Sequence, residues 1–188
     1  MAAALACRKM GIECTVIVPG STPQSAADNI KEHGAKVEYF GKVWDDADEE
    51  ARRRLSDDSV LYINPFDHPK IWTGHSTVID EIKEDLAGRI PSLVVCSVGG
   101  GGLLLGVLEG LERNDWSTVP VLAMETFGAE SLNSAMEKRQ LVRLDDIKSI
   151  AKSLGSKQVA SAALKKSMEH PGKVYSKVCH DTQCIKGY

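Results

Sequence analysis

Four consecutive glycines, Gly99, Gly100, Gly101 and Gly102, carry the strongest chemical signal in the sequence. They follow an apolar segment, residues 92–98 (SLVVCSV), and precede an apolar helical segment. Glycines at the carboxyl end of a parallel strand let the backbone turn tightly and point N–H groups outward, beside the positive end of the next helix. This arrangement favours a phosphate ligand. The alternative is a tight turn that binds nothing.

The spacing of the glycines narrows the class of phosphate. A dinucleotide-binding fingerprint requires a third glycine, but Leu104 or Leu105 stands at that position in either register. A P-loop requires a lysine followed by Ser or Thr, which the next helix does not supply. A small phosphate monoester is the ligand that the loop predicts.

Other reactive residues give weaker signals. The five cysteines are an odd number without a C-x-x-C pair, which is typical of reduced thiols in the cytoplasm. Cys179, His180 and Cys184 lie close together, but structural zinc requires four ligands and no second pair has suitable spacing. Structural roles are favoured for His68 and His75. Four lysines lack a glycine-flanked apolar context and are expected at the surface: Lys9, Lys42, Lys70 and Lys157.

Composition excludes several classes of partner. The 188 residues include 23 Lys and Arg against 26 Asp and Glu, so the formal net charge of −3 provides no basic field for nucleic acid. No apolar run approaches the length of a membrane span. We therefore expect a cytoplasmic globular protein without a nucleic-acid or membrane partner.

Strand and helix patterns alternate along the chain, which predicts an α/β fold with parallel sheets and flanking helices. We expect two lobes, with residues 1–68 in the smaller and residues 69–188 in the larger. Within the larger lobe, residues 92–98 should form a buried strand, and Val107, Leu108 and Leu111 should lie in the core. The acidic and basic residues of segment 44–55 should form a solvated helix face. The expected strands are residues 14–18, 36–40, 60–63, 92–98, 120–124, 147–151 and 173–178, and the expected helices are residues 1–10, 25–33, 44–55, 73–86, 103–113, 129–138 and 158–168.

Four motifs together resemble one enzyme family. They are residues 64–77 (NPFDHPKIWTGHST), 97–103 (SVGGGGL), 123–131 (AMETFGAES) and 149–155 (SIAKSLG). On these motifs the chain is similar, from Met1 to about Asp181, to the serine dehydratase branch of the pyridoxal-phosphate enzymes with the tryptophan synthase β fold. The resemblance implies an incomplete fold of type II, with the larger lobe binding pyridoxal 5'-phosphate.

The resemblance implies roles for particular residues. The four glycines and Leu103 would hold the cofactor phosphate, Phe66 would lie near the cofactor pocket, and Ser153, Leu154 and Gly155 would run along the pyridine ring. A monovalent cation, usually potassium, would bind near the loop. Its oxygen ligands would come from Gly99, Glu125, Ala129, Leu154 and Ser156. Without the resemblance, Glu125 would be read as an ordinary carboxylate after a strand.

The family reaction is β-elimination from a small amino-acid substrate. The resemblance therefore implies an L-serine and L-threonine ammonia-lyase of amino-acid catabolism, forming pyruvate or 2-oxobutanoate and ammonia, and a homodimer. The family's Schiff-base lysine lies upstream of a Ser-x-Gly-Asn-Ala loop, and neither matches a segment of this sequence. The downstream glycine-rich segment that contacts the pyridine nitrogen also has no counterpart. We therefore expect a chain truncated at both ends, without a catalytic lysine and with little or no activity alone.

Two alternatives stay open. One is a threonine dehydratase or another fold type II enzyme. The other is a protein without catalytic activity, either a pseudoenzyme that keeps the phosphate site or a truncated isoform.

Overall fold

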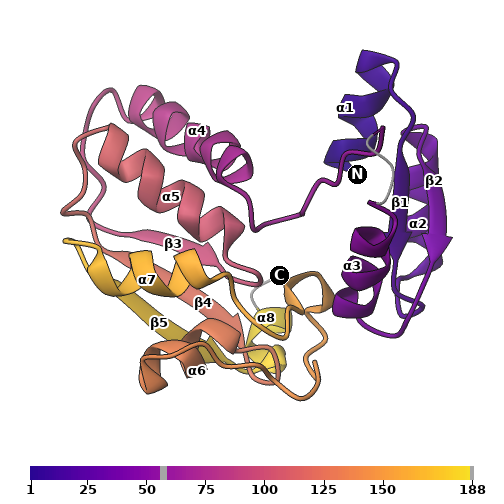
Figure 1. The fold of residues 1–188 in the computed structure, drawn as a ribbon. Coiled ribbons are helices and arrows are strands. Elements are labelled where there is room, and N and C mark those ends of the chain that lie inside the picture. The colour runs from indigo at the N-terminus through magenta and orange to yellow at the C-terminus, as the bar shows by residue number, and fades with distance from the viewer. Residues whose placement is uncertain (56–58, 187–188) are drawn as a thin grey trace. The chain divides into compact units, whose positions relative to one another are not determined.

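The computed structural model describes residues 1–55 and 59–186, and the chain divides into two compact units, Met1–Asn64 and Pro65–Tyr188 (Figure 1). The division falls four residues before the expected boundary, which followed residue 68. The reason is that Phe66 packs against Gly100 and His68 caps the first helix of the second unit. That the units are parts of a smaller and a larger lobe stays a prediction.

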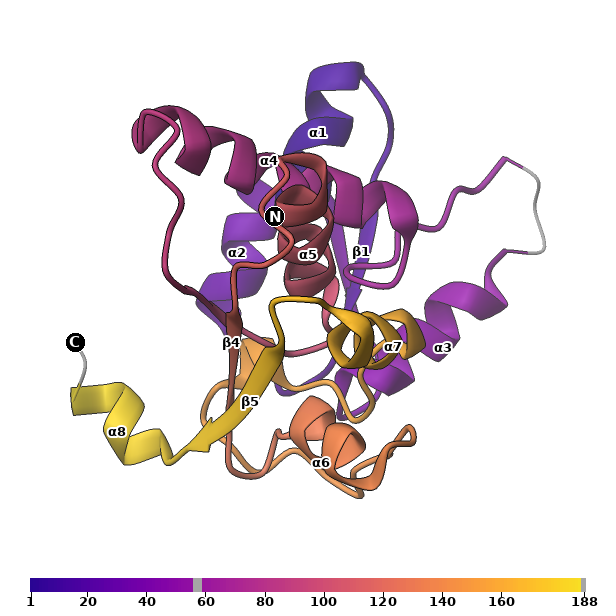
Figure 2. The same ribbon diagram turned by 90° about the vertical axis from the view of Figure 1, so that its left-hand side faces the viewer.

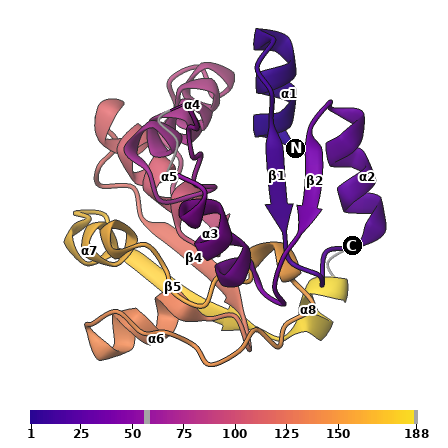
Figure 3. The same cartoon turned by 45° about the vertical axis from the view of Figure 1, so that its right-hand side comes forward.

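The first unit is a small parallel α/β unit. It contains α1 (Ala2–Met10), β1 (Thr15–Val18), α2 (Gln24–Glu32), β2 (Lys36–Tyr39) and α3 (Trp44–Arg53). Strands β1 and β2 lie side by side and run in parallel, with Thr15 opposite Lys36 (Figure 3). Their small core contains Ala4, Val18 and Ile30.

Helix α3 has the ion pairs that its sequence predicts, but its charged residues are not all solvated. Arg52 pairs with Asp48 over 2.8 Å, and both Arg53 and Arg54 pair with Glu50. Glu50 is only 4% exposed. The solvated face expected for this helix is therefore wrong at Glu50, whose carboxylate is buried beneath the two arginines that neutralise it.

The second unit contains a three-stranded parallel sheet with the order β3-β4-β5 (Figure 1). Its strands β4 and β5 are also labelled in Figure 2. The registers pair Val94 with Val121 and Val121 with Val174. The expected parallel α/β class is confirmed, whereas the last helix was not predicted. The elements are α4 (Pro69–Asp85), β3 (Val94–Ser97), α5 (Gly102–Arg113), β4 (Val121–Thr126), α6 (Ser131–Lys138), the 3-10 helix η1 (Lys152–Leu154), α7 (Ser161–Glu169), β5 (Val174–Cys179) and α8 (Asp181–Lys186).

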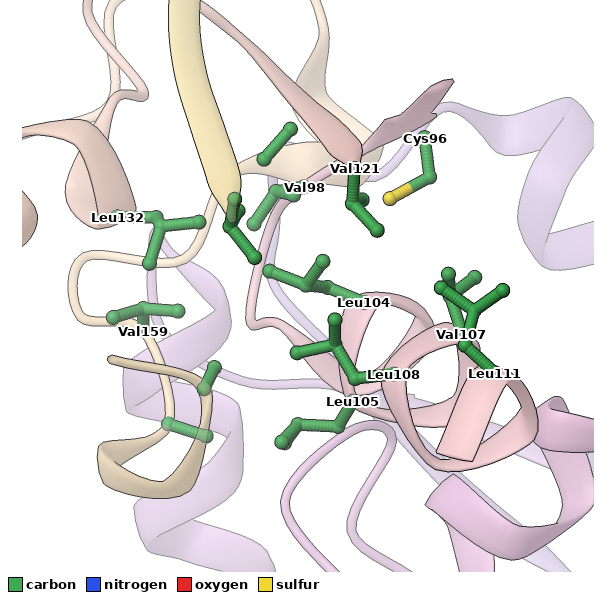
Figure 4. Packing of buried hydrophobic residues seen from close by; sticks show 14 of the residues in the cluster. Cys96, Val98, Leu104, Leu105, Val107, Leu108, Leu111, Val121, Leu132 and Val159 are labelled. Atoms are coloured by element: carbon green, nitrogen blue, oxygen red, sulfur yellow. The ribbon is translucent and has the colours of Figure 1, made fainter. Parts of the chain in front are cut away.

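The main core of the second unit lies between the sheet and helices α5, α6 and α7. Leu104 points from α5 toward Val98 and Val121, and Leu132 and Val159 close the other side (Figure 4). Both crossovers, from β3 to β4 and from β4 to β5, move in the same direction across the sheet. Because such crossovers are right-handed, their helices cover the same face. The expected core positions Val107, Leu108 and Leu111 are buried there.

The expectation that residues 92–98 form a fully buried strand is wrong. Strand β3 is at the edge of the sheet, and its side chains alternate between the two faces. Cys96 faces the core at 9% exposure, while Val95 is 59% exposed. The cause is that helices α5, α6 and α7 cover only one face of this sheet. Among the described residues of the second unit, no helix covers the other face.

Two expected strands are also wrong, residues 60–63 and 147–151. Among the described residues, no strand pairs with the first segment, and its Leu61 is 84% exposed. In the second segment the Lys148 N–H donates to the Gly128 carbonyl, and the Ile150 N–H donates to the Asp181 carboxylate. β-branched residues favour a strand, but these two segments lack a strand partner.

Helices α4 and α5 approach each other closely through two glycines of α5. A Cβ on Gly106 would lie 2.4 Å from the Cβ of His75, and a Cβ on Gly110 would lie 2.6 Å from the Ser76 carbonyl oxygen. An ion pair between Arg113 of α5 and Asp80 of α4 adds to the contact. Since α4 begins three residues after Phe66, this packing fixes where Phe66 enters the second unit.

Candidate phosphate-binding site

The tetraglycine loop, Gly99 to Gly102, joins β3 to α5. Gly101 adopts φ +93° as the N-cap of α5, a backbone conformation that favours glycine. Within residues 1–55 and 59–186, the backbone N–H groups of Gly99 to Leu103 donate no hydrogen bond to another part of the chain. The loop therefore presents five adjacent donors at the positive end of a helix, which is a suitable site for an anion.

Phe66 packs directly on the loop. A Cβ on Gly100 would lie 2.3 Å from Cγ of the Phe66 ring, and a Cβ on Gly102 would lie 2.8 Å from the Phe66 Cα. No side chain larger than hydrogen fits at either position unless Phe66 moves. Phe66 is thus in direct packing contact with the loop, and its expected place near the cofactor pocket stays a prediction.

The other two glycines are also closely packed. A Cβ on Gly99 would lie 2.9 Å from the Leu154 Cα, and a Cβ on Gly101 would lie 2.6 Å from the Ala163 Cβ. Packing alone therefore accounts for all four glycines. The feature that favours a ligand over a plain tight turn is the set of N–H groups without partners.

Trp72 anchors Phe66 against the loop. Its indole Nε1–H donates to the Phe66 carbonyl over 2.7 Å. The side chain of His68 accepts a hydrogen bond from the Lys70 N–H and caps α4, which is the structural role expected for this histidine. Trp72 was not predicted as a site residue, although it lies within the motif of residues 64–77 and its indole requires a hydrogen-bond partner when buried.

Glu125 is a buried carboxylate at the end of β4, 1% exposed. Its Oε1 accepts from the Leu132 N–H over 2.9 Å and its Oε2 from the Asn133 N–H over 2.7 Å, so it caps α6. Burial raises the pKa of Glu125 to about 7, although the two backbone donors oppose this shift. Glu125 is therefore not an ordinary exposed carboxylate.

The residues expected to bind a cation carry several oxygen atoms without a cationic partner. In the part of the chain that the structure describes, no Lys, Arg or His pairs with Glu125, and the carbonyl oxygens of Gly99 and Ala129 accept no hydrogen bond. The Leu154 carbonyl accepts from the Ser156 N–H over 2.9 Å. Both Ala129 and Ser156 are buried. This donor set has the chemistry that a hard monovalent cation requires.

The segment expected along the pyridine ring is only partly at the loop. Leu154 lies against Gly99, whereas Ser153 is exposed on η1 and no described contact joins it to the glycines. Gly155 packs on Ile147, whose Cγ2 would lie 2.9 Å from a Cβ at that glycine. The structure therefore places Leu154, but not Ser153, beside the glycine loop.

Comparison with known proteins places the chain in a family. Residues 1–184 match the family described as "Pyridoxal-phosphate dependent enzyme". The chain belongs to this family. Its cofactor carries a phosphate monoester, the ligand class that the spacing of the glycines predicts.

The relatives agree with the resemblance seen in the sequence. The chain is 42% identical over 186 residues to an L-serine dehydratase/L-threonine deaminase from Mus musculus and 44% identical to one from Homo sapiens. Each alignment covers 98% of this chain and 56% of the relative. The chain therefore spans just over half the length of these relatives.

Solved structures of pyridoxal-phosphate enzymes share the fold. A fungal L-serine ammonia-lyase from Rhizomucor miehei matches with a TM-score of 0.90 and 34% identity, over 98% of this chain and 58% of that one. Maize serine racemase matches with a TM-score of 0.85 at 22% identity, which concerns the fold alone. The expected fold of type II is confirmed.

No group of three or more metal-ligating side chains occurs among residues 1–55 and 59–186. Cys179 and Cys184 approach to 3.4 Å between their sulfur atoms, and both are free thiols. His180, between them in sequence, stacks on Phe127 with 4.4 Å between ring centroids. In the same described ranges, no helix combines the length and hydropathy that crossing a membrane requires.

Proposed function

We propose that the tetraglycine loop binds the phosphate of pyridoxal 5'-phosphate. One observation carries this proposal: among the described residues, the five adjacent backbone N–H groups of Gly99 to Leu103 have no hydrogen-bond acceptor, and they lie at the N-terminus of α5 in a chain of the pyridoxal-phosphate family. Gly99, Gly100, Gly101, Gly102 and Leu103 would donate to the phosphate oxygens. Phe66 and Leu154 would support the loop from outside, and Ser153, Leu154 and Gly155 would face the cofactor ring.

For the whole protein we propose an L-serine and L-threonine ammonia-lyase. The bound cofactor supplies an electron sink for the substrate α-carbon. The relatives at 42% and 44% identity are named for both substrates, while solved threonine deaminases share 22% and 26% identity with this chain. This difference favours the serine branch over a dedicated threonine dehydratase.

Phosphate recognition can be tested on the wild-type chain. Pyridoxal 5'-phosphate should bind at least about 100-fold more tightly than pyridoxal, because several charge-assisted hydrogen bonds depend on the phosphate. Inorganic phosphate should compete with the cofactor. Equal affinity for the two compounds, measured by absorption or fluorescence titration, would contradict the proposal.

A pair of glycine variants gives a matched control. Gly100→Ala places a methyl group 2.3 Å from the Phe66 ring and should abolish the preference for the phosphorylated cofactor. Gly74→Ala lies on an exposed part of α4, where a Cβ meets nothing within 4 Å, and should bind like wild type. Circular dichroism of both variants checks that they fold.

The catalytic part of the proposal has its own assay. The whole protein should release pyruvate from L-serine and 2-oxobutanoate from L-threonine. For the 188-residue chain, borohydride reduction with the cofactor followed by intact-mass analysis should give no lysine adduct, because no lysine here matches the family's position. An adduct would contradict that expectation. A whole protein that binds the cofactor but forms no product would instead support the alternative without catalysis.

We also propose that a potassium ion binds near the loop, at Glu125 and the backbone oxygens of Gly99, Ala129, Leu154 and Ser156. The buried carboxylate without a cationic partner supports this site. Potassium chloride should raise the urea midpoint of unfolding more than tetramethylammonium chloride at the same ionic strength. Equal midpoints would contradict the cation site.

The proposal extends to location and assembly. The five free cysteines favour a cytoplasmic location. The homodimer implied by the family resemblance predicts a mass of two subunits in light scattering of the whole protein.

A further inference from the structure

Three side chains link the ends of β4 and β5 to the segment of residues 147–156. Thr126, the last residue of β4, donates from Oγ1 to Ser149 Oγ over 2.7 Å. Ser149 Oγ donates to Asp181 Oδ1 over 2.7 Å. Asp181 is the first residue of α8, two residues after the end of β5. The chain of hydrogen bonds therefore ends on a carboxylate.

The same network holds the backbone of the segment. Asp181 Oδ2 accepts from the Ile150 N–H over 3.0 Å, and Ser149 Oγ accepts from the Ala151 N–H over 3.0 Å. If residues 147–151 formed a strand, the N–H groups of Ile150 and Ala151 would donate to a neighbouring strand. Because the segment has no strand neighbour, side chains supply the acceptors.

The direction of the network is fixed by its chemistry. A carboxylate only accepts, so the Ser149 hydroxyl donates to Asp181 and accepts from Thr126 and Ala151, which uses its full capacity. Ser149 is 1% exposed and Thr126 is 4% exposed. The Ile150 N–H and the Ser149 hydroxyl lower the pKa of Asp181 below its usual range. The Asp181 end of the network is more open, because Asp181 is half-buried and Ile150 is 58% exposed. Each donor and acceptor named here is nevertheless satisfied, which favours a single arrangement of the segment.

Residues 149–154 connect this hydrogen-bond network to the glycine loop. The Leu154 N–H donates to the Ala151 carbonyl over 2.9 Å, which closes the turn of η1. The Cα and carbonyl oxygen of Leu154 then lie 2.9 and 3.0 Å from the position of a Cβ on Gly99. Residues 150 and 151 are thus connected to the first glycine of the loop through one tight turn and one close backbone contact.

We propose that Asp181 is a positioning residue for the phosphate loop. It holds residues 149–154 against Gly99 without touching the cofactor itself. The part of this inference that concerns cofactor affinity rests on the proposed function, whereas the part that concerns the backbone does not.

Amide hydrogen exchange tests the backbone part directly. Asp181→Ala should speed exchange at Ile150 by about tenfold or more, since the Ile150 N–H loses its hydrogen bond to a charged group. Exchange at Ala151 should also speed up, because its acceptor Ser149 loses the bond to Asp181 that holds it. Asp181→Asn keeps only one acceptor and should give an intermediate rate. Thr182→Ala, at the exposed next residue of α8, is the matched control and should leave both rates unchanged.

Cofactor binding tests the positioning role. Asp181→Ala should weaken binding of pyridoxal 5'-phosphate by about tenfold, as expected for one charge-assisted bond. Affinity for pyridoxal should stay the same, because only the phosphate contacts depend on the loop. A general loss of folded structure would instead weaken the binding of both compounds.

Two results with Asp181→Ala would overturn the inference. One is unchanged exchange at Ile150, and the other is faster exchange with unchanged affinity for the phosphorylated cofactor.

A second variant covers the case in which the Asp181 variants do not fold. Thr126→Val removes the first donor of the network at similar volume and should also speed exchange at Ala151. Unchanged exchange at Ala151 in this variant overturns the inference. If wild type shows no phosphate-dependent binding, the proposed function and the cofactor part both fail, while the exchange rates still decide the backbone part.

Discussion

Replacing two glycines by alanine in adjacent helices should change stability in opposite directions. Gly110 lies in α5, where a Cβ would be 2.6 Å from the Ser76 carbonyl oxygen and 2.8 Å from two side-chain atoms of Ile79. Gly74 lies in α4, where a Cβ would meet nothing within 4 Å. Both residues are helical, so the intrinsic helix preference of alanine acts equally on them.

The expected magnitudes follow from these contacts. Alanine in place of glycine favours a helix by about 1 kcal/mol. At Gly110 the new methyl group lies 2.6 Å from a backbone oxygen and must displace α4 backbone, which places the cost in the upper part of the usual range for overpacking, about 2–3 kcal/mol. Gly110→Ala should therefore lower the free energy of unfolding by about 1–2 kcal/mol, and Gly74→Ala should raise it by about 0.5–1 kcal/mol.

Urea unfolding followed by tryptophan fluorescence measures both values, because Trp116 is 4% exposed in the core of the second unit. With a slope of about 2 kcal/mol per molar urea, the two midpoints should differ by about 1 M. A Gly110→Ala variant as stable as wild type, or a Gly74→Ala variant destabilised by the same amount, would refute the close α4–α5 contact.

Three further predictions concern the same unit. Trp72→Phe removes the donor to the Phe66 carbonyl and should cost about 1–3 kcal/mol in urea unfolding, and a change below that range would refute the anchoring role. Leu111→Ala empties a fully buried position and should cost about 2–5 kcal/mol in the same assay, so a near-neutral result would place Leu111 outside the core. Burial raises the pKa of the Cys96 thiol to about 11, so a maleimide at neutral pH should label exposed Cys184 first and Cys96 last; early labelling of Cys96 in peptide mass analysis would contradict the buried position.

The tetraglycine loop was predictable because its requirements are local. A glycine run between an apolar strand and an apolar helix needs no knowledge of the rest of the chain. The structure adds that Phe66 and Leu154 already require glycine at Gly99, Gly100 and Gly102, so the run has a packing cause as well. The sequence could not separate these two causes, since both produce the same residues.

The wrong strand predictions arise because strands depend on contacts between residues that are far apart in the sequence. Residues 60–63 and 147–151 have strand composition, but a strand requires a neighbour that local propensity does not reveal. Strand β3 was predicted as buried on both faces because its sequence is continuously apolar. Its edge position depends on the direction of both crossovers, which no short window contains.

The contacts of two carboxylates, Glu125 and Asp181, also could not be predicted from the neighbouring sequence. Glu125 caps a helix through N–H groups seven and eight residues further along, and Asp181 reaches Ser149 across 32 residues. The family resemblance predicted a cation-binding role for Glu125, but the observed contacts of these carboxylates do not follow from the residues beside them. The signal for Asp181 was only its place at the end of the resemblance.

Amide chemical shifts during a titration with pyridoxal 5'-phosphate test the central claim most directly. If the loop binds the phosphate, the amide signals of Gly99 to Leu103 should move together and saturate, and inorganic phosphate alone should shift the same signals. Saturable shifts elsewhere in the chain with these five amides unchanged would contradict the account, because the unpartnered N–H groups of the loop would then not be the phosphate site.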